Sequence, residues 1–531
     1  MKPITLAITN ARIWTADPRR KWAQALAVAG DRIAAVSTDE ELAPLARQAI
    51  ERMDARGRMV VPGFTDCHVH ILEGGRRLHQ LSLRDARSRE EFIGRIRDYA
   101  ARLPEGAWIT GGDWDHERWG GELPRKDWID PATPRHPVWI NRLDGHMGLA
   151  NSLALKLAGI SRDTAEVRGG AIVRDESGEP VGLLKDNAMA LLSRVIPPPG
   201  ADDLDKALQA AMRHLAALGV TSVHHMGSWS DLEVFRRARA AGRLTTRIYA
   251  AVPLSDYERL HEEVRRKGRG DEWLRIGGLK GFADGSLGSR TAAFLEPFAD
   301  EPNNRGLLVN PPEQLEGWIA GADRAGLHVM VHAIGDRGNR LLLDIYERVA
   351  RRHGKRDRRF RIEHAQHVAA EDVRRFSRLG VIASMQPYHA IDDGRWAERA
   401  VGARRLRDCY RFRSLLDSRA VLAFGSDWYV APASPLEGIY AAVTRRTLDG
   451  AHPEGWVPEE KITLEESLLA YTRSAAFAAF EEDLKGSIAA GKLADFVMLD
   501  PDLTRIAPEE IPSAKVKLTV TGGRVVHREE P

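Results

Sequence analysis

The most informative segment of the sequence is Val60-Val61-Pro62-Gly63-Phe64-Thr65-Asp66-Cys67-His68-Val69-His70. Its apolar start predicts a β-strand, and its end carries two histidines spaced two residues apart. Side chains alternate between the two faces of a strand, so His68 and His70 point to one side and Cys67 to the other. The pair can present two imidazoles to one metal ion, although isolated histidine pairs more often have structural roles. The remaining ligands must come from elsewhere in the chain.

The composition is typical of a soluble globular protein with more than one folding unit. The chain has 531 residues, of which 43% are hydrophobic and 29% charged, and its formal net charge is +3. Acidic and basic residues are interspersed, so we expect no nucleic-acid partner. Two cysteines are too few for a disulfide framework. The sequence shows neither a signal peptide nor an apolar run of the ~20 residues that span a bilayer, so we expect no membrane partner and a cytoplasmic location.

Short apolar runs alternate with helical patterns along most of the chain, which predicts βα repeats around a parallel sheet. The helix predicted over residues 202–218 is an example, because acidic residues occupy its first turn and Gly219 stands at its end. Eight strands with intervening helices predict an α/β fold, the (β/α)8 TIM barrel, whose active sites lie at the C-terminal ends of the strands. The predicted strands cover residues 59–64, 220–224, 247–252, 276–282, 328–332, 360–363, 381–385 and 421–425.

Two departures from a simple barrel define the predicted domains. About 150 residues separate the first two strands, far more than one crossover helix requires. We therefore predict a large insertion after strand 1, a partly β subdomain at about residues 72–200 that lies over the barrel mouth and contains a hairpin within residues 170–183. Short strands with turn punctuation at both ends predict a small β-sandwich built from residues 1–61 and 480–531. Residues 62–479 then form the barrel.

Residue types that bind metals recur at the ends of the predicted strands. Each has an ordinary alternative explanation: Asp427 as a helix N-cap, His364 as a core histidine, Lys280 as the ion-pair partner of Asp284. Together, four imidazoles and a carboxylate on one barrel face predict a site for divalent zinc, nickel, cobalt or manganese. The candidates are His68 and His70 after strand one, Lys280 on strand four, His332 and His364 at the ends of strands five and six, and Asp427 after strand eight.

These motifs resemble the amidohydrolase superfamily, in the amidohydrolase family 3 branch that includes N-substituted formamide deformylases and many other metal-dependent hydrolases. The resemblance covers essentially the whole chain. Gly145-His146 with Asn151-Ser152 also matches the usual insertion motif of this branch. The residues that carry the resemblance lie at 62–70, 280, 284–292, 332–336, 363–364 and 425–427.

The resemblance implies two metal positions, one held by His68, His70 and Asp427 and the other by His332 and His364. Lys280 falls where binuclear members carry a lysine carboxylated on its amine, so the implied cofactor is a pair of zinc ions bridged by carboxylated Lys280. An unmodified ammonium has only donors and would repel a metal. Burial beside cations favours the neutral amine that reacts with carbon dioxide.

The implied reaction is hydrolysis of a non-peptide C–N bond, in an amide or an N-formyl or N-acyl amine, by a metal-activated water. Asp427 would be the catalytic base and then the acid that protonates the departing nitrogen. A mononuclear deaminase is an alternative, but deaminases of the family carry a glutamate three residues after the strand-five histidine, where this chain has Gly335. An esterase or lactonase on the same metal centre stays open. A non-catalytic binding module is disfavoured, because no ligand position has been lost.

Five further residues are candidates for binding a small-molecule substrate. His146 either orients the substrate or bonds within its own loop, and Trp114 either lines the pocket or fills the core of the insertion. His389 follows strand seven and either reaches the substrate or has a structural role. Asp284 and Arg290 follow strand four, where they would shape the mouth or bind a polar group. The resemblance is also compatible with a homodimer.

Overall fold

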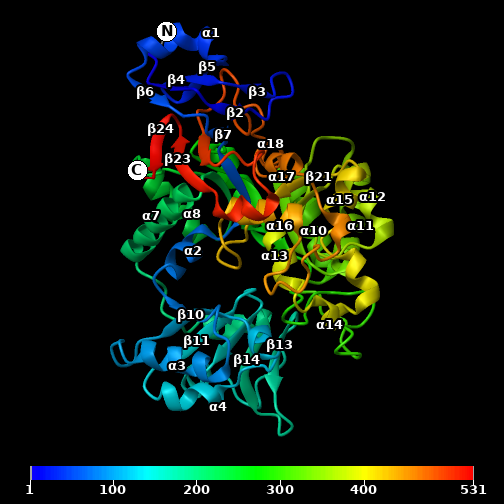
Figure 1. The fold of residues 1–531 in the computed structure, drawn as a ribbon. Helices are drawn as coiled ribbons and strands as arrows, with labels where there is room; N and C mark the ends of the chain where they lie inside the picture. The colour runs from blue at the N-terminus through cyan, green and yellow to red at the C-terminus, as the bar shows by residue number, and fades with distance from the viewer. Residues whose placement is uncertain (1–2, 530–531) are drawn as a thin grey trace.

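The computed structural model describes residues 3–529 and has an eight-stranded parallel sheet at its centre (Figure 1). Neighbouring strands follow one another in chain order, and the sheet curls until the last strand approaches the first through a parallel bridge between Val69 and Trp428. This confirms the predicted TIM barrel. The strands are β8 (Phe64–Val69), β15 (Val220–Met226), β16 (Arg247–Pro253), β17 (Leu274–Phe282), β18 (His328–Ala333), β19 (Arg361–His364), β20 (Ile382–Met385) and β21 (Val421–Phe424).

The prediction that residues 59–64 form the first barrel strand is wrong. Strand β7 (Met59–Pro62) belongs to a different sheet, in which it pairs with β2 (Arg12–Trp14) and β22 (Phe496–Asp500). The chain changes sheet at Gly63, whose amide donates to the carbonyl of Asp495 at 2.9 Å. A Cβ at Gly63 would lie 2.2 Å from the hydroxyl of Thr221, so only glycine fits this crossing. Strand β8 begins at the next residue.

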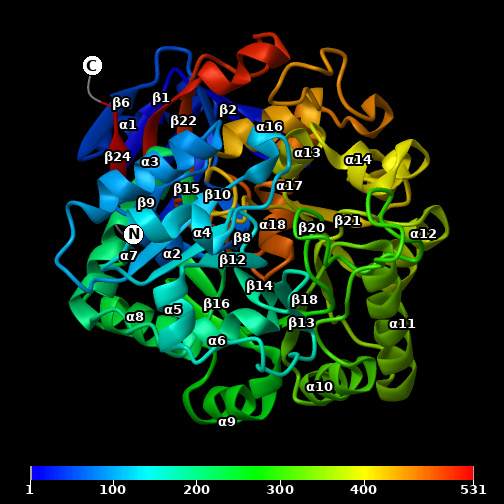
Figure 2. The ribbon, with the colours of Figure 1, turned by 90° about the horizontal axis from the view of Figure 1, so that it is seen from below.

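Helices surround the barrel, and Figure 2 shows α7 to α12 following one another around the strands. Helix α11 illustrates why these segments are helical. Leu342, Ile345, Tyr346 and Val349 are buried along one face, and the helix begins with Asp336 and ends in basic residues, which suits the helix dipole. The helices of this ring are α7 (Ala201–Ala217), α8 (Trp229–Ala240), α9 (Tyr257–Lys267), α10 (Pro312–Arg324), α11 (Asp336–His353) and α12 (Ala370–Leu379), and α16 (Pro435–Thr444) lies near the end of the barrel chain.

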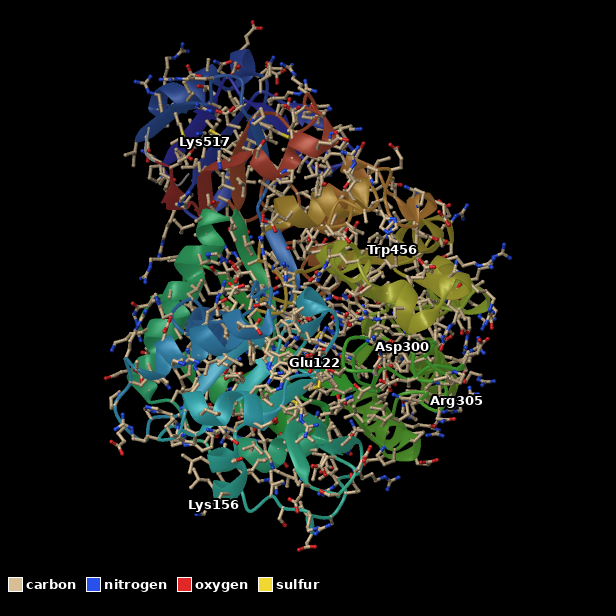
Figure 3. The ribbon with its side chains drawn as sticks, turned by 60° about the horizontal axis from the view of Figure 1, so that its bottom comes forward. Glu122, Lys156, Asp300, Arg305, Trp456 and Lys517 are labelled. Carbon is tan, nitrogen blue, oxygen red and sulfur yellow. The ribbon has the colours of Figure 1, made fainter. Side chains whose placement is uncertain are left out.

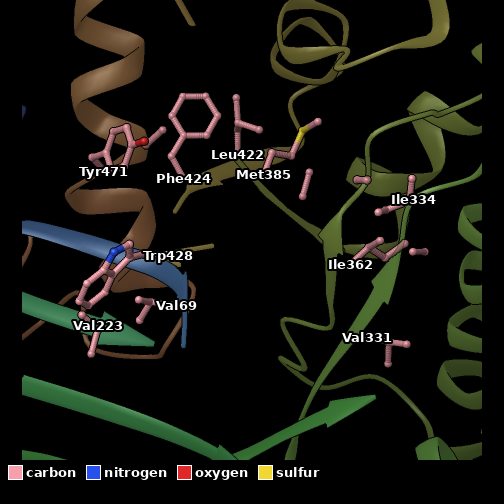
Figure 4. Close-up of a cluster of buried hydrophobic side chains, with 14 of the residues drawn as sticks. Val69, Val223, Val331, Ile334, Ile362, Met385, Leu422, Phe424, Trp428 and Tyr471 are labelled. Atoms are coloured by element: carbon pink, nitrogen blue, oxygen red, sulfur yellow. The ribbon is translucent and has the colours of Figure 1, made fainter. Parts of the chain in front are cut away.

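Strand residues that face away from the barrel axis form the layer between strands and helices. Figure 4 shows part of this buried cluster, including Val69, Val331 and Ile362. Each buried aliphatic side chain contributes roughly 1.5–3 kcal/mol relative to exposure. Because side chains alternate along a strand, burying Val331 outside the barrel turns its neighbour His332 to the inside. The hydrophobic pattern therefore orients the polar residues of the site.

Two β-sheets at one end of the molecule confirm the sandwich predicted from the two termini (Figure 1). Leu6, Ile13, Val60 and Met498 are buried between them. The boundaries at residues 61 and 480 stay predictions. One sheet contains β5 (Arg32–Ser37), β4 (Ala25–Ala29), β1 (Leu6–Thr9) and β6 (Glu51–Asp54), and the other β24 (Arg524–Arg528), β23 (Lys515–Thr521), β22, β7, β2 and β3 (Trp22–Ala23).

The insertion lies at the opposite end of the barrel, as the positions of Lys517 in the sandwich and Lys156 in the insertion show in Figure 3. Its strands β13 (Gly170–Arg174) and β14 (Pro180–Asp186) form the predicted antiparallel hairpin. Across residues 3–529, no helix is both long and apolar enough to cross a membrane. The insertion sheet has the order β13 (Gly170–Arg174), β14 (Pro180–Asp186), β12 (Met147–Ala150), β11 (Val138–Arg142), β10 (Ile109–Trp114) and β9 (Leu81–Ser82), flanked by α3 (Arg89–Ala100), α4 (Lys126–Ile129) and α5 (Ser152–Leu157).

Candidate metal centre

One cavity lies between the C-terminal ends of the barrel strands and the insertion. The insertion contributes Arg142, Asp144 and His146 to its wall, and Trp396 and Tyr429 add aromatic surface from the barrel loops. This placement agrees with Figures 1 and 2, in which the insertion covers one end of the barrel. The structure brings all six predicted metal ligands to this cavity: His68, His70, Lys280, His332, His364 and Asp427.

The donor atoms of the ligands have the spacing that a metal ion needs. The Oδ1 of Asp427 lies 3.3 Å from the Nε2 of His70 and 3.5 Å from the Nε2 of His68. Ligand atoms about 2.0–2.1 Å from one tetrahedral ion stand roughly 3.3 Å apart. The rings of His332 and His364 are centred 4.5 Å from each other, and His364 is 4.7 Å from the ring of His68. The two predicted groups of ligands are therefore adjacent.

Three of the histidines have one ring nitrogen held by a neighbouring oxygen. The Nδ1 of His68 lies 2.7 Å from a carboxylate oxygen of Glu363, and the Nδ1 of His364 lies 2.8 Å from the amide oxygen of Gln386. The Nε2 of His332 lies 2.9 Å from the carbonyl oxygen of Gly285. Such partners fix the tautomer and leave the other nitrogen as a metal ligand. The residues present therefore fit a divalent metal.

Burial sets the charge of the site. It lowers the pKa of His68, His332 and His364 well below the usual value, so all three are neutral imidazoles that can bind a metal. It also lowers the pKa of Lys280 to about 8, against the attraction of Glu363 and Asp427. Burial alone would raise the pKa of Asp427, but the imidazoles of His68 and His70 lower it to about 2. The site thus combines three neutral imidazoles, those of His68, His332 and His364, with the carboxylate of Asp427 and the amine of Lys280.

The backbone is strained at two ligands. His364 has φ of 74° and Asp427 has φ of 59°, both in the left-handed region that residues other than glycine rarely adopt. The amide of Asp427 donates to the carbonyl of His68 at 2.7 Å, and the amide of Ala365 donates to that of Ala333 at 3.0 Å. Such strain clusters at functional sites, where the surrounding structure maintains it.

Two of the predicted substrate-binding residues line the cavity. The Nδ1 of His146 lies 2.7 Å from the carboxylate of Asp186, and its ring is centred 4.8 Å from that of His332. The ring of His389 is stacked on that of His364, with 6.3 Å between the ring centres. The Nε2 of His389 is buried without a hydrogen-bond partner among residues 3–529. Both imidazoles can therefore contact a molecule bound next to the ligands.

The other three substrate-binding candidates are not among the residues that line the cavity. Trp114 is fully buried in the core of the insertion and donates its indole N–H to the carbonyl of Ile140. Asp284 is fully buried and accepts the backbone amides of Ala293, Ile334 and Gly335, rather than pairing with Lys280. Arg290 pairs with Asp300 at 2.7 Å and donates to the carbonyl of Leu287. All three side chains hold the structure around the cavity.

The prediction missed the polar contacts that join the insertion to the barrel. Asp144 accepts hydrogen bonds from Ser286 and Ser289 of the loop after β17, and it pairs with Arg142 at 2.8 Å. Arg395, after β20, pairs with Asp115 of the insertion at 3.0 Å. Asp144 directly precedes the Gly145-His146 motif, and this position was the one local feature that could have pointed to Asp144. The contacts themselves join segments far apart in the sequence.

A (β/α)8 barrel that presents histidines, a lysine and an aspartate at its strand ends defines a class of metal-dependent hydrolases. The profile of the amidohydrolase family matches residues 51–527. The chain belongs to this family, and the prediction of a metal-dependent hydrolase acting on carbon–nitrogen bonds is confirmed.

Three similar proteins illustrate this membership. LONG AFTER FAR-RED 3 from Arabidopsis thaliana is 41% identical over 98% of this chain and 91% of that protein. N-substituted formamide deformylase from Arthrobacter pascens is 30% identical over 98% of this chain and 97% of that protein. The crystal structure of an uncharacterized metal-dependent hydrolase from Pyrococcus horikoshii is similar with a TM-score of 0.77 and 28% identity, covering 95% of this chain and 99% of that one.

Proposed function

We propose that this protein hydrolyses N-formyl or N-acyl amines of small molecules at a centre of two zinc ions bridged by carboxylated Lys280. The observation that carries the proposal is the position of Lys280. Its amine is buried, lies 3.3 Å from the Nε2 of His68 and shares one cavity with all the other ligands. A cation at this point would oppose metal binding, whereas a carbamate would assist it. The name of the deformylase relative supports the N-formyl amine as a substrate.

Six residues of this chain would bind the two metal ions. His68, His70 and Asp427 would hold one ion, His332 and His364 the other, and Lys280 both. When bound, the metal supplies Lewis acidity, which acidifies water and polarises a carbonyl group.

Asp427 is placed to move the proton. Its Oδ1 lies 3.3 Å from the Nε2 of His70 and 3.5 Å from that of His68, so it would stand beside the bound ion, where it would take a proton from the attacking water and pass it to the departing nitrogen. His146 and His389 lie on the cavity wall, where they would orient the acyl group and the amine. The products are the carboxylic acid and the free amine.

The position at which family deaminases carry a glutamate offers no acid in this chain. Gly335 occupies the position of the expected glutamate, and the next residue, Asp336, accepts the backbone amide of Leu295 at 2.8 Å. That hydrogen bond commits the carboxylate of Asp336 to the start of α11. Ring deamination is therefore not favoured.

Metal analysis and a substrate panel test the proposal. The purified enzyme would be analysed for bound metal and assayed on N-formyl amines, N-acyl amines, the esters of the same acids and amino-substituted heterocycles. We expect two metal ions per chain and the fastest turnover on an N-formyl or N-acyl amine. One ion per chain together with ammonia release would support the deaminase, and faster ester cleavage would overturn the assignment of substrate class.

A further inference from the structure

The histidine ligands have partners of different charge. His68 faces a carboxylate, that of Glu363, at 2.7 Å. His364 faces the neutral amide of Gln386 at 2.8 Å, and His332 faces the backbone carbonyl of Gly285 at 2.9 Å. The three contacts have similar lengths, so the difference between them is one of charge.

Arg361 is the charged partner of Glu363. Both side chains are fully buried, and the Nε of Arg361 lies 2.7 Å from one carboxylate oxygen while its Nη2 donates to the other at 3.0 Å. Ser384 and the carbonyl of Cys67 accept further hydrogen bonds from the same guanidinium. Arginine keeps its proton in proteins, so Glu363 and Arg361 form a buried ion pair through both carboxylate oxygens.

Asp284 is a second carboxylate near the other pair of ligands, but it is engaged differently. Its Oδ1 lies 3.6 Å from the Nε2 of His332, beyond hydrogen-bond distance. Its two oxygens accept three backbone amides, those of Ala293, Ile334 and Gly335. The direct acceptor for His332 is therefore a neutral carbonyl oxygen.

We infer that Glu363 is a positioning residue that makes the His68–His70–Asp427 group the tighter of two metal positions, while Gln386 leaves the His332–His364 group weaker. An anionic acceptor on Nδ1 increases the basicity of the opposite nitrogen and so strengthens its bond to a metal. The group that contains His68 also has the carboxylate of Asp427 as a ligand. The His332–His364 group has no carboxylate of its own and has only the bridging Lys280 in addition to its two imidazoles. The inference rests on the proposed function, because it presupposes two metal positions.

Stepwise zinc binding to the metal-free full-length protein tests this inference without an activity assay. Zinc would be titrated in competition with a coloured chelator, and the two association steps resolved. We expect Glu363→Gln to weaken the tighter step by about 10–100-fold and to leave the weaker step unchanged. His332→Asn, which removes a ligand of the other group, should abolish the weaker step and thereby identify it.

Glu460→Gln is a matched control, because Glu460 is also a buried carboxylate and accepts hydrogen bonds from Ser414 away from the cavity. It should change neither step. Since Glu363→Gln leaves Arg361 unpaired and could prevent folding, Gln386→Glu provides an independent test. This variant gives His364 an anionic acceptor and should strengthen the weaker step.

The outcomes separate this inference from the proposed function. If Glu363→Gln weakens the other step or neither step, or if Gln386→Glu leaves the weaker step unchanged, the inference is wrong. If the wild-type protein binds one zinc ion, the binuclear proposal fails. The effect of Glu363→Gln on that single step then still decides whether Glu363 supports the His68 group.

Discussion

The backbone amide of Asp427 donates to the carbonyl oxygen of His68 across 2.7 Å. The end of the last barrel strand is thus joined to the first strand at two proposed metal ligands. The next contact, from the amide of His70 to the carbonyl of Trp428 at 2.8 Å, continues the same seam. Closing the barrel and bringing the proposed ligands His68 and Asp427 together are therefore one structural event.

Metal removal should destabilise the whole barrel. An ion held by His68 and Asp427 links the two strands that close the sheet, and a ligand that binds the folded state alone stabilises it by about 4 kcal/mol at a thousand times its dissociation constant. Thermal melting of protein with and without a chelator measures this effect. Equal melting temperatures would contradict a link across the seam, and adding zinc back should restore the difference.

Asp427→Asn should abolish hydrolysis without unfolding the protein. The amide cannot take a proton from water, and loss of general acid–base catalysis lowers the rate by about 10²–10⁴-fold. Turnover, bound metal and melting temperature would be measured together. Asp163→Asn, which changes an exposed carboxylate of the insertion, is the control and should behave like wild type. Wild-type turnover in Asp427→Asn would contradict the role of Asp427 in proton transfer.

Lys280→Ala should be inactive, and short carboxylic acids should restore part of its activity. The truncated side chain leaves space beside His68, where an added carboxylate can replace the carbamate as a bridge. Lys280→Arg should gain nothing from the same acids, because a guanidinium fills the space and stays charged. Activity measured against acetate concentration tests this expectation. Full activity of Lys280→Ala without added acid would show that no bridge is needed.

Asp144 should contribute to stability in a pH-dependent way. Burial alone would raise its pKa, but Arg142, His146 and the hydroxyl of Ser286 lower it from 3.8 to about 2. Because the pKa of Asp144 is lower in the folded protein than in the unfolded chain, its ionised carboxylate stabilises the folded protein at pH values above the unfolded-state pKa. This contribution of about 2 kcal/mol is lost as the pH falls from about 4 to about 2.

Asp144→Asn should imitate the protonated form. The unfolding free energy of the variant should therefore lie furthest below that of wild type near neutral pH, and the gap should narrow as the pH approaches 2. Urea unfolding at a series of pH values measures the gap. A gap independent of pH would mean that Asp144 is not ionised in the folded protein.

Trp114 and His146 should respond differently to substitution. Trp114 fills the insertion core, so Trp114→Ala should cost about 3–5 kcal/mol of stability while the folded fraction keeps its KM. His146 lies on the cavity wall, so His146→Asn should alter KM or kcat with little change in stability. Unfolding and steady-state measurements on both variants test the pair. A changed KM without a loss of stability in Trp114→Ala would instead indicate that Trp114 contacts the substrate.

The meeting of the six candidate ligands at one cavity could be predicted because the signal is local. A histidine, lysine or aspartate directly after an apolar strand lies at the C-terminal end of that strand, and in a parallel barrel all such ends meet. The crossing at Gly63 could not be predicted in this way. Residues 59–64 form one apolar run, and nothing in its pattern shows that the chain changes sheet within it.

The roles of individual polar side chains were harder to predict, because they depend on contacts between distant segments. Asp284 is separated from Ile334 and Gly335 by most of a βα unit, and their amides determine where its carboxylate points. Asp144 likewise meets Ser286 only when the insertion packs on the barrel. Sequence proximity to a motif therefore identified the neighbourhood of the site but not which side chains face the cavity.

The pairing of β7 with β22 has a consequence for biosynthesis. During translation the amino-terminal strands emerge first, and β7 keeps an open apolar edge until β22 and β23 leave the ribosome hundreds of residues later. Open edges of this kind pair readily with wrong partners. A chain that stalls inside the barrel thus carries an aggregation-prone strand next to an unfinished catalytic domain, and only a chain that continues through β22 can shield it.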